Sequence, residues 1–233
     1  MIPLKDSIVR RTFPAVTLAL ILINAGVFFH ELTLPPRADQ AFVMTYGLVP
    51  AHVQAALEAK SKLNLNDALV IPLFTSMFLH GGWLHIIDNM WFLWIFGDNV
   101  EDELGHLRYL IFYLICGLGS GAAQLLFSWG SRLPAIGASG AISGVMGAYL
   151  IFFPGTQVLT LVPLLIFFFT VRVPAIVFIG IWFLFQFLSG MGSMQNGASG
   201  GVAWWAHVGG FVLGIVLVKT VIPPTQKRKV YGL

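Results

Sequence analysis

The chain has 233 residues, of which 57% are hydrophobic and only 10% charged, and its mean hydropathy is +0.83. A soluble domain carries charge on about a quarter of its residues, so this composition excludes a water-soluble globule and indicates a polytopic membrane protein. The basic residues lie near the chain ends and beside apolar segments, without a basic face that would bind nucleic acid. The single cysteine, Cys116, excludes an intramolecular disulfide.

Six apolar segments approach the ~20 residues that a membrane-spanning helix needs. We expect spans at 13–30, 84–97, 107–127, 136–153, 173–189 and 204–221. The first segment could be a signal peptide, but it lacks a small-residue cleavage signature, so an uncleaved span is expected. The sequence therefore predicts an all-α membrane protein that forms a single domain over residues 1–233.

The segments between the spans differ in character. Residues 33–72 form a long connection, which predicts a functional loop or one that lies at the membrane interface. A glycine-rich loop follows the fifth span at 190–203. The apolar stretch 156–172 is interrupted by Pro163, so we expect a short interfacial or partly embedded connection. The acidic run 98–103 is expected to be a solvated inner loop.

An even number of spans places both termini on one side of the membrane. Most cations then share that side, namely Lys5, Arg10, Arg11, Arg108, Arg172, Lys219, Lys227, Arg228 and Lys229, whereas Arg37, Lys60, Lys62 and Arg132 fall on the other. Because Lys and Arg mark the cytoplasmic face, we expect both termini inside, in a plasma membrane that we expect to be prokaryotic.

Polar residues occur in the first turns of three spans that all enter from the outer side. The second span carries His85 and Asn89, the fourth Ser139, and the sixth His207. Ionisable and hydrogen-bonding groups are costly inside a membrane and normally face a protein interior or a wet cavity. Their common depth therefore predicts a site just below the outer surface.

The residue types fit nucleophilic attack on an amide. A serine hydroxyl needs a neighbouring base, and His207 is the candidate base for Ser139. The oxyanion of the tetrahedral intermediate needs donors. Unpaired backbone N–H groups at the start of the fourth span, around Gly137 and Ala138, are candidates.

His85 and Asn89 are further oxyanion candidates, because residues i and i+4 project from one face of a helix. No Asp or Glu follows Glu103, so a Ser–His dyad is predicted rather than a triad. Asp88 is the remaining candidate third member, but it points about 100° away from Asn89 around the helix.

Three motifs together resemble the rhomboid intramembrane serine proteases. Gly137-Ala138-Ser139-Gly140 matches their G-x-S-G motif, and His85-Ile86-Ile87-Asp88-Asn89 matches H-x-x-x-N. Ala206-His207-Val208-Gly209-Gly210 with Gly214 matches A-H-x-x-G-x-x-x-G. The motifs also stand in the same order and on the same spans as in that family.

The resemblance implies a six-transmembrane-helix rhomboid bundle with an outward-open, water-filled active-site cavity. It implies cleavage of transmembrane segments of other membrane proteins, in contact with membrane lipid. No cofactor is expected, and no metal site is expected because the sequence has no H-E-x-x-H motif and its single cysteine is remote from every histidine. Ser139 would be the nucleophile, His207 the base, and His85 and Asn89 oxyanion donors. Residues 190–201 would form a cap over the cavity.

The resemblance also assigns a lateral gate for substrates to the fifth span, with Trp182 and Phe185 as part of it. This chain departs from the family's residue pattern at two places. Some members carry an aromatic residue one turn after the nucleophile, where this chain has Ser143, so less support for the His207 ring is expected. Some carry a Trp-Arg pair in the first outer loop, where this chain has Ile71-Pro72.

Other interpretations compete with the protease. Small residues at four-residue spacing also serve close helix packing, which could account for Ser139 and accounts best for Ser143. A second Gly-Ala-Ser-Gly contains Ser199, but no helix start follows it to supply oriented N–H groups. A catalytically inactive relative that binds transmembrane clients is the main alternative. A small transporter is disfavoured because no internal repeat is visible.

Overall fold

The computed structural model describes residues 1–58, 64–164, 167–195 and 202–220, and most of these residues are helical. The long helices are α1 (Ala15–Thr33), α5 (Trp83–Leu104), α6 (His106–Phe127), α7 (Ser139–Phe152), α8 (Ala175–Gln195) and α9 (Trp204–Thr220). Shorter elements between α1 and α5 are α2 (Pro36–Tyr46), α3 (Pro50–Leu57), the π-helical turn η1 (Asn66–Val70), α4 (Ile71–Thr75) and the 3-10 turn η2 (Ser76–Phe78). The strands are β1 (Ile2–Asp6), β2 (Gln157–Leu164) and β3 (Phe167–Pro174).

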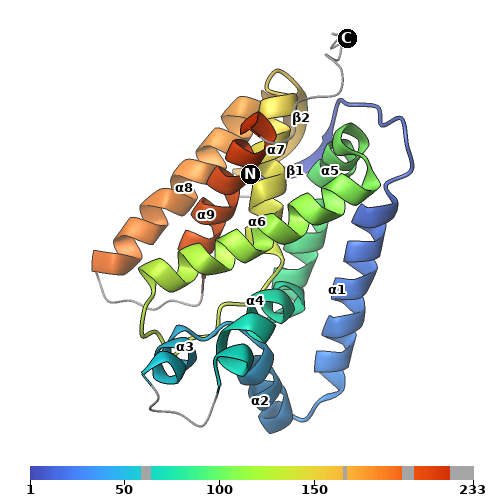
Figure 1. Cartoon of the computed structure of the whole chain (residues 1–233). Helices are drawn as coiled ribbons and strands as arrows, with labels where there is room; N and C mark the ends of the chain where they lie inside the picture. Colours follow the sequence, from blue (N-terminus) through green and yellow to red (C-terminus); the bar gives the residue numbers. More distant parts are fainter. Residues whose placement is uncertain (59–63, 165–166, 196–201, 221–233) are drawn as a thin grey trace.

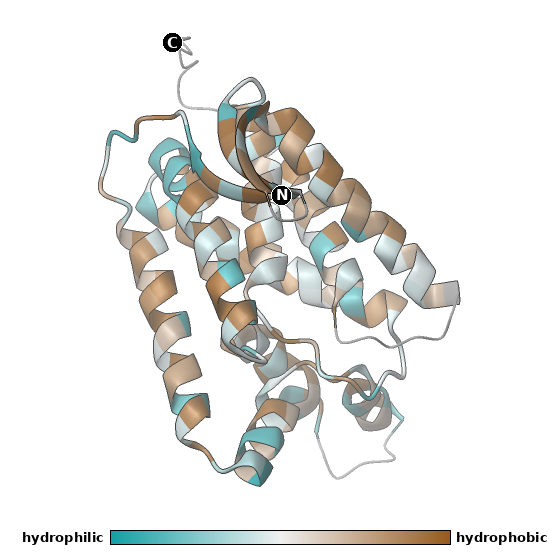
Figure 2. Ribbon diagram, turned by 180° about the vertical axis from the view of Figure 1, so that it is seen from behind, coloured by the Kyte–Doolittle hydropathy of each residue, from teal (hydrophilic) through white to brown (hydrophobic). Residues whose placement is uncertain are grey.

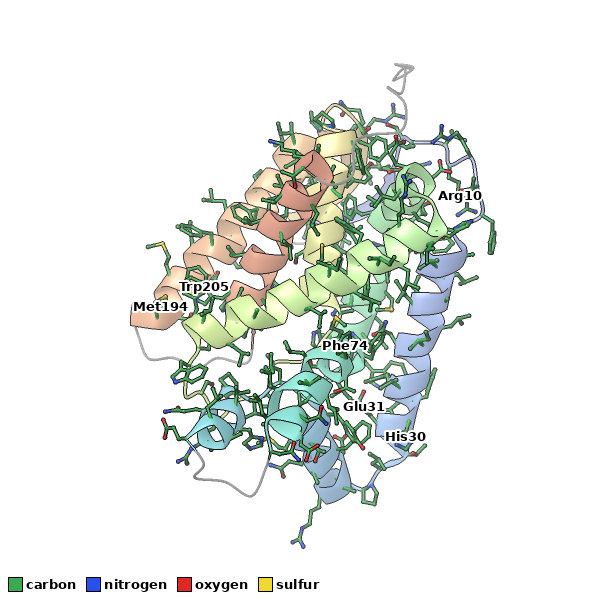
Figure 3. All side chains as sticks on the ribbon, viewed as in Figure 1. Arg10, His30, Glu31, Phe74, Met194 and Trp205 are labelled. Atoms are coloured by element: carbon green, nitrogen blue, oxygen red, sulfur yellow. The ribbon has the colours of Figure 1, made fainter. Side chains whose placement is uncertain are left out.

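The short helices and the strands lie at opposite ends of the molecule. Figure 1 shows α2, α3 and α4 gathered at one end, and β1 and β2 at the other. Arg10 lies at the end with the strands, whereas His30 and Glu31 lie at the far end of α1 (Figure 3). Hydrophobic residues predominate along the middle of α1, and hydrophilic residues gather toward the two ends of the molecule (Figure 2).

Within the described part of the chain, three helices, α1, α6 and α8, are long and apolar enough to cross a membrane. A fourth span results if Asn66–Phe78 and α5, which are bent by 79° at their junction, count together. The apolar helices α7 and α9 are shorter, with 14 and 17 residues. In α7 every residue from Gly140 to Tyr149 is buried, so this helix is surrounded by protein and its length need not match the lipid.

The expectation of an all-α chain is wrong in one region. Residues 156–172, predicted as an interfacial connection, mostly form the β2–β3 hairpin, and β1 pairs with β2 in an antiparallel sheet of order β1-β2-β3. The alternation of Val158, Thr160 and Val162 suits a strand. Pro163 is tolerated because it lies beyond Leu161, the last residue of β2 that pairs with β1.

The acidic run 98–103 is not a solvated loop, because α5 continues through it to Leu104. The carboxylate of Glu101 is fully buried and accepts hydrogen bonds from the backbone N–H of Val16 at 2.8 Å and of Thr17 at 2.7 Å. These donors belong to the first turn of α1, which has no side-chain cap of its own. Glu101 therefore satisfies N–H groups that the helix geometry leaves free.

Glycines set the close approach of α7 and α9. A Cβ added to Gly210 of α9 would overlap the Gly140 carbonyl of α7, and one added to Gly214 would overlap the Gly144 carbonyl. Small residues at such contacts allow two helix backbones to approach directly. This packing fixes the first turn of α7 beside the first turn of α9, where the residues of the predicted site stand.

Candidate active site

Ser139 and His207 are brought together by the contact between α7 and α9. Ser139 is the first residue of α7, and its Oγ lies 2.7 Å from Nε2 of His207 in the first turn of α9. Both side chains are only partly buried. The distance is that of a good hydrogen bond, so the imidazole is placed to accept the hydroxyl proton.

The other ring nitrogen of His207 contacts a residue that the sequence analysis did not identify. Nδ1 of His207 lies 2.7 Å from Oε1 of Gln186 in α8. An amide oxygen only accepts hydrogen bonds, so Nδ1 carries the proton and Nε2 is left to accept from Ser139. Gln186 is 6% exposed. Its signal in the sequence is that it is the one polar amide within the apolar stretch 173–189.

The side chains of Ser139 and His207 line a cavity of about 460 Å³ between α5, α7, α8 and α9. The cavity is lined by His85, Asp88, Asn89, Phe92, Ile136, Ser139, Ile142, Ser143, Met146, Trp182, Phe185, Gln186, Val202, Ala203, Trp204 and His207. The predicted gate residues Trp182 and Phe185 are therefore part of its wall. Mostly apolar walls with a few convergent polar groups are typical of a binding pocket for a largely apolar ligand.

His85 presents a donor to this cavity. The backbone N–H of Gly81 donates to its Nδ1 at 3.2 Å, so in the neutral ring the proton is on Nε2. A Cβ added to Gly137 would lie 2.7 Å from that Nε2 and 3.7 Å from Ser139 Oγ. The Nε2–H group of His85 and the serine hydroxyl therefore both border the position that a Cβ of residue 137 would occupy.

Asn89 is buried in the same wall with its amide turned toward its own helix. Its Nδ2 donates to the carbonyl of His85 at 2.7 Å, and its Oδ1 has no hydrogen-bond partner among the described residues. Asn89 therefore holds the turn that carries His85, and one N–H of its amide is already used.

The backbone at Gly137 differs from the prediction. Gly137 has φ +117°, a conformation that favours glycine, and its N–H donates to the Ser76 carbonyl at 2.8 Å. That N–H is therefore not free to bind an oxyanion in this structure. Within the described residues, the N–H groups of Ala138 and Ser139 make no hydrogen bond and lie at the start of α7.

Ser143 is fully buried, and its Oγ donates to the Ser139 carbonyl at 2.6 Å, which is the behaviour of a packing residue. The ring support that an aromatic residue at 143 would give comes from other helices. The rings of Trp182 and Trp204 lie 6.1 Å and 6.4 Å from the His207 ring. Ser199 lies outside the described residues, at 196–201. The expectation of a loop from residue 190 is wrong at its start, because α8 continues to Gln195.

Asp88 lines the cavity but makes no hydrogen bond to His207, whose Nδ1 is occupied by Gln186. Ile71 and Pro72 occupy the positions where some family members carry a Trp-Arg pair. They begin the short helix α4, and Pro72 is buried. Neither residue lines the cavity.

Comparison with known proteins identifies relatives across most of the chain. A family model described as the Rhomboid domain matches residues 68–224. "RHOMBOID-like protein 6, mitochondrial" of Arabidopsis thaliana is 41% identical over 78 residues, which are 34% of this chain and 25% of that protein. "Rhomboid protease GluP" of Bacillus subtilis is also 41% identical over 78 residues, covering 34% of this chain and 15% of that protein.

A longer match is "Rhomboid protein 1, mitochondrial" of Saccharomyces cerevisiae, which is 28% identical over 169 residues, 68% of this chain and 44% of that protein. Each of these matches spans less than half of the relative's own length. The Rhomboid domain match covers the helices that carry Ser139, His207, His85 and Asn89. The chain therefore belongs to the rhomboid family of membrane proteins.

Proposed function

We propose that the protein is an intramembrane serine protease that cleaves transmembrane segments of other membrane proteins with Ser139 and His207. The observation that carries this proposal is the 2.7 Å contact between Ser139 Oγ and His207 Nε2, inside a cavity that also holds His85 and Asn89. Family membership adds support, because one of its relatives is named a rhomboid protease. The substrates and the surrounding lipid are part of the same proposal.

The proposed reaction begins when His207 Nε2 accepts the proton of the Ser139 hydroxyl as Oγ attacks the carbonyl carbon of the scissile bond. The oxyanion of the tetrahedral intermediate is bound by the free N–H groups of Ala138 and Ser139 and by Nε2–H of His85. The second N–H of the Asn89 amide, which is not given to the His85 carbonyl, is a further donor in this proposal. The protonated His207 then gives its proton to the leaving amine. Water attacks the acyl group on Ser139 in the second half of the reaction, with His207 again as the base.

Gln186 takes the place of the carboxylate of a triad in this mechanism. It accepts the Nδ1–H of His207 and so fixes both the tautomer and the plane of the imidazole. A neutral amide stabilises the protonated ring less than a carboxylate does, but it is less costly to bury among apolar helices. The catalytic unit is thus a Ser–His dyad with an orienting glutamine.

The proposal includes the topology. A single rhomboid membrane domain over residues 1–233 would cross the membrane six times, with the short helix α7 enclosed by the other helices and the cavity open toward the outer side. Arg10, Arg11 and Arg108 near the strands would then face the cytoplasm, as would both termini. The expectation of a prokaryotic membrane stays a prediction, since the relatives come from plants and yeast as well as from Bacillus subtilis.

The test is cleavage of a fluorescent transmembrane substrate by the purified chain in liposomes. Ser139→Ala should abolish cleavage, whereas Ser143→Ala, which removes a hydroxyl one turn away, should leave most of it. Activity at the level of the unmodified protein in Ser139→Ala would remove the nucleophile assignment. A protein that binds transmembrane segments without cleaving them would support the alternative, an inactive relative that binds membrane clients.

A further inference from the structure

The proposed mechanism leaves one charged group in the cavity unused, the carboxylate of Asp88. Among the described residues that line the cavity, Asp88 is the one carboxylate, and none is Lys or Arg. Its side chain is exposed to the cavity, and within the described part of the chain it forms no hydrogen bond or ion pair. Hydrolysis does not require it, because Gln186 already occupies His207 Nδ1.

Asp88 lies near the contact between α5 and α8. One turn farther along α5, the ring of Phe92 contacts that of Phe178 in α8, with 6.4 Å between ring centroids. Residues i and i+4 share a helix face, so Asp88 lies on the same face as Phe92. On α8, Trp182 is one turn beyond Phe178 and also lines the cavity. A chain segment bound beside Ser139 in this cavity can therefore contact Asp88, because both side chains line it.

An unpaired carboxylate inside a membrane segment is expensive and by default indicates a place where a ligand passes or binds. A partner that would compensate the charge must carry a cation. The ammonium group of Lys or the guanidinium group of Arg would form a charge-assisted hydrogen bond with Asp88. A substrate Asp or Glu would be repelled at this position.

We propose that Asp88 forms a cation-binding subsite, which selects transmembrane segments that carry Lys or Arg within four residues of the cleaved bond. This inference rests on the proposed function and names its substrate class. Asp88 acts in recognition, beside the catalytic residues and not as one of them.

The experiment compares cleavage of transmembrane peptides that carry Lys, Gln or Glu at each of the four positions on either side of the cleaved bond. At one or more positions the unmodified protein should prefer Lys over Gln by about tenfold in kcat/KM, with Glu the poorest. Asp88→Asn should bring the ratio of kcat/KM for the Lys peptide to that for the Gln peptide close to one. Asp88→Lys should give the Glu peptide the highest kcat/KM. Asp67→Asn, which changes an exposed acid outside the cavity, should keep the preference for Lys.

A ratio near one at every position in the unmodified protein would overturn the inference, and so would a Lys preference that survives Asp88→Asn. Asp88→Glu, which keeps the charge, should retain the preference and provides a second variant if Asp88→Asn folds poorly. The dissociation constants of the same peptides for Ser139→Ala and for Ser139→Ala with Asp88→Asn separate the two proposals. Selective binding of Lys peptides without cleavage in the unmodified protein would refute the protease and retain the cation subsite, whereas cleavage without charge preference would do the reverse.

Discussion

Gly137→Ala tests the placement of His85 beside the nucleophile. The added methyl group would lie 2.7 Å from His85 Nε2 and 2.9 Å from its Cε1, so the ring must move out of its position. The φ of +117° adds strain of about 1–3 kcal/mol for any residue with a side chain. If His85 is an oxyanion donor, its displacement should lower kcat by about 10²–10³-fold, the effect of losing one such donor.

The assay is cleavage in liposomes, with the thermal unfolding midpoint measured in parallel. Gly105→Ala is the matched control, because Gly105 has φ +77° but nothing lies within 4 Å of an added Cβ. It should lose similar stability and keep its kcat. If Gly137→Ala also kept kcat while losing the same stability, His85 would not act on the oxyanion and the proposed donor set would be refuted.

Three further changes test the supports of the site. Gln186→Leu leaves the buried Nδ1–H of His207 unpaired and should lower kcat by roughly 10–100-fold with a small change in KM, measured by steady-state cleavage; an unchanged kcat would deny the orienting role. Glu101→Gln replaces an acceptor at the start of α1 with a donor and should cost about 1–3 kcal/mol of stability in thermal unfolding, without altering kcat in the folded protein. Gly210→Ala should separate α7 from α9 and lose both activity and stability, whereas Gly180→Ala, with nothing within 4 Å, should lose neither.

Much of the architecture could be predicted because it depends on local chemistry. Apolar segments mark the helices in a membrane protein, and their predicted positions lie within a few residues of the observed helices, except that α5 and α8 extend farther. Family membership follows from short motifs around Ser139, His85 and His207, and the Rhomboid domain match confirms it. The meeting of Ser139 and His207 could be anticipated because alternating spans place their first turns at one depth.

The features that were missed depend on contacts between distant segments. The residues of the acidic run by themselves indicate a solvated loop. Glu101 instead caps α1, which lies some 85 residues earlier in the chain. Pro163 argued against a strand in the region of the β2–β3 hairpin. The strand tolerates this proline because β1 pairs with β2 only as far as Leu161. Gln186 is an isolated polar residue with no motif around it, and its role depends on how α8 packs beside α9. The pairing of the Gly137 N–H with Ser76 has no local signal at all.

The pairing of Ser139 with His207 is tested by the site of covalent labelling with a fluorophosphonate probe, mapped by mass spectrometry on the purified full chain. If His207 activates Ser139, a single adduct is expected on Ser139, which is lost in His207→Ala and kept in Ser143→Ala. An adduct on another serine, or labelling of Ser139 that does not depend on His207, would contradict it.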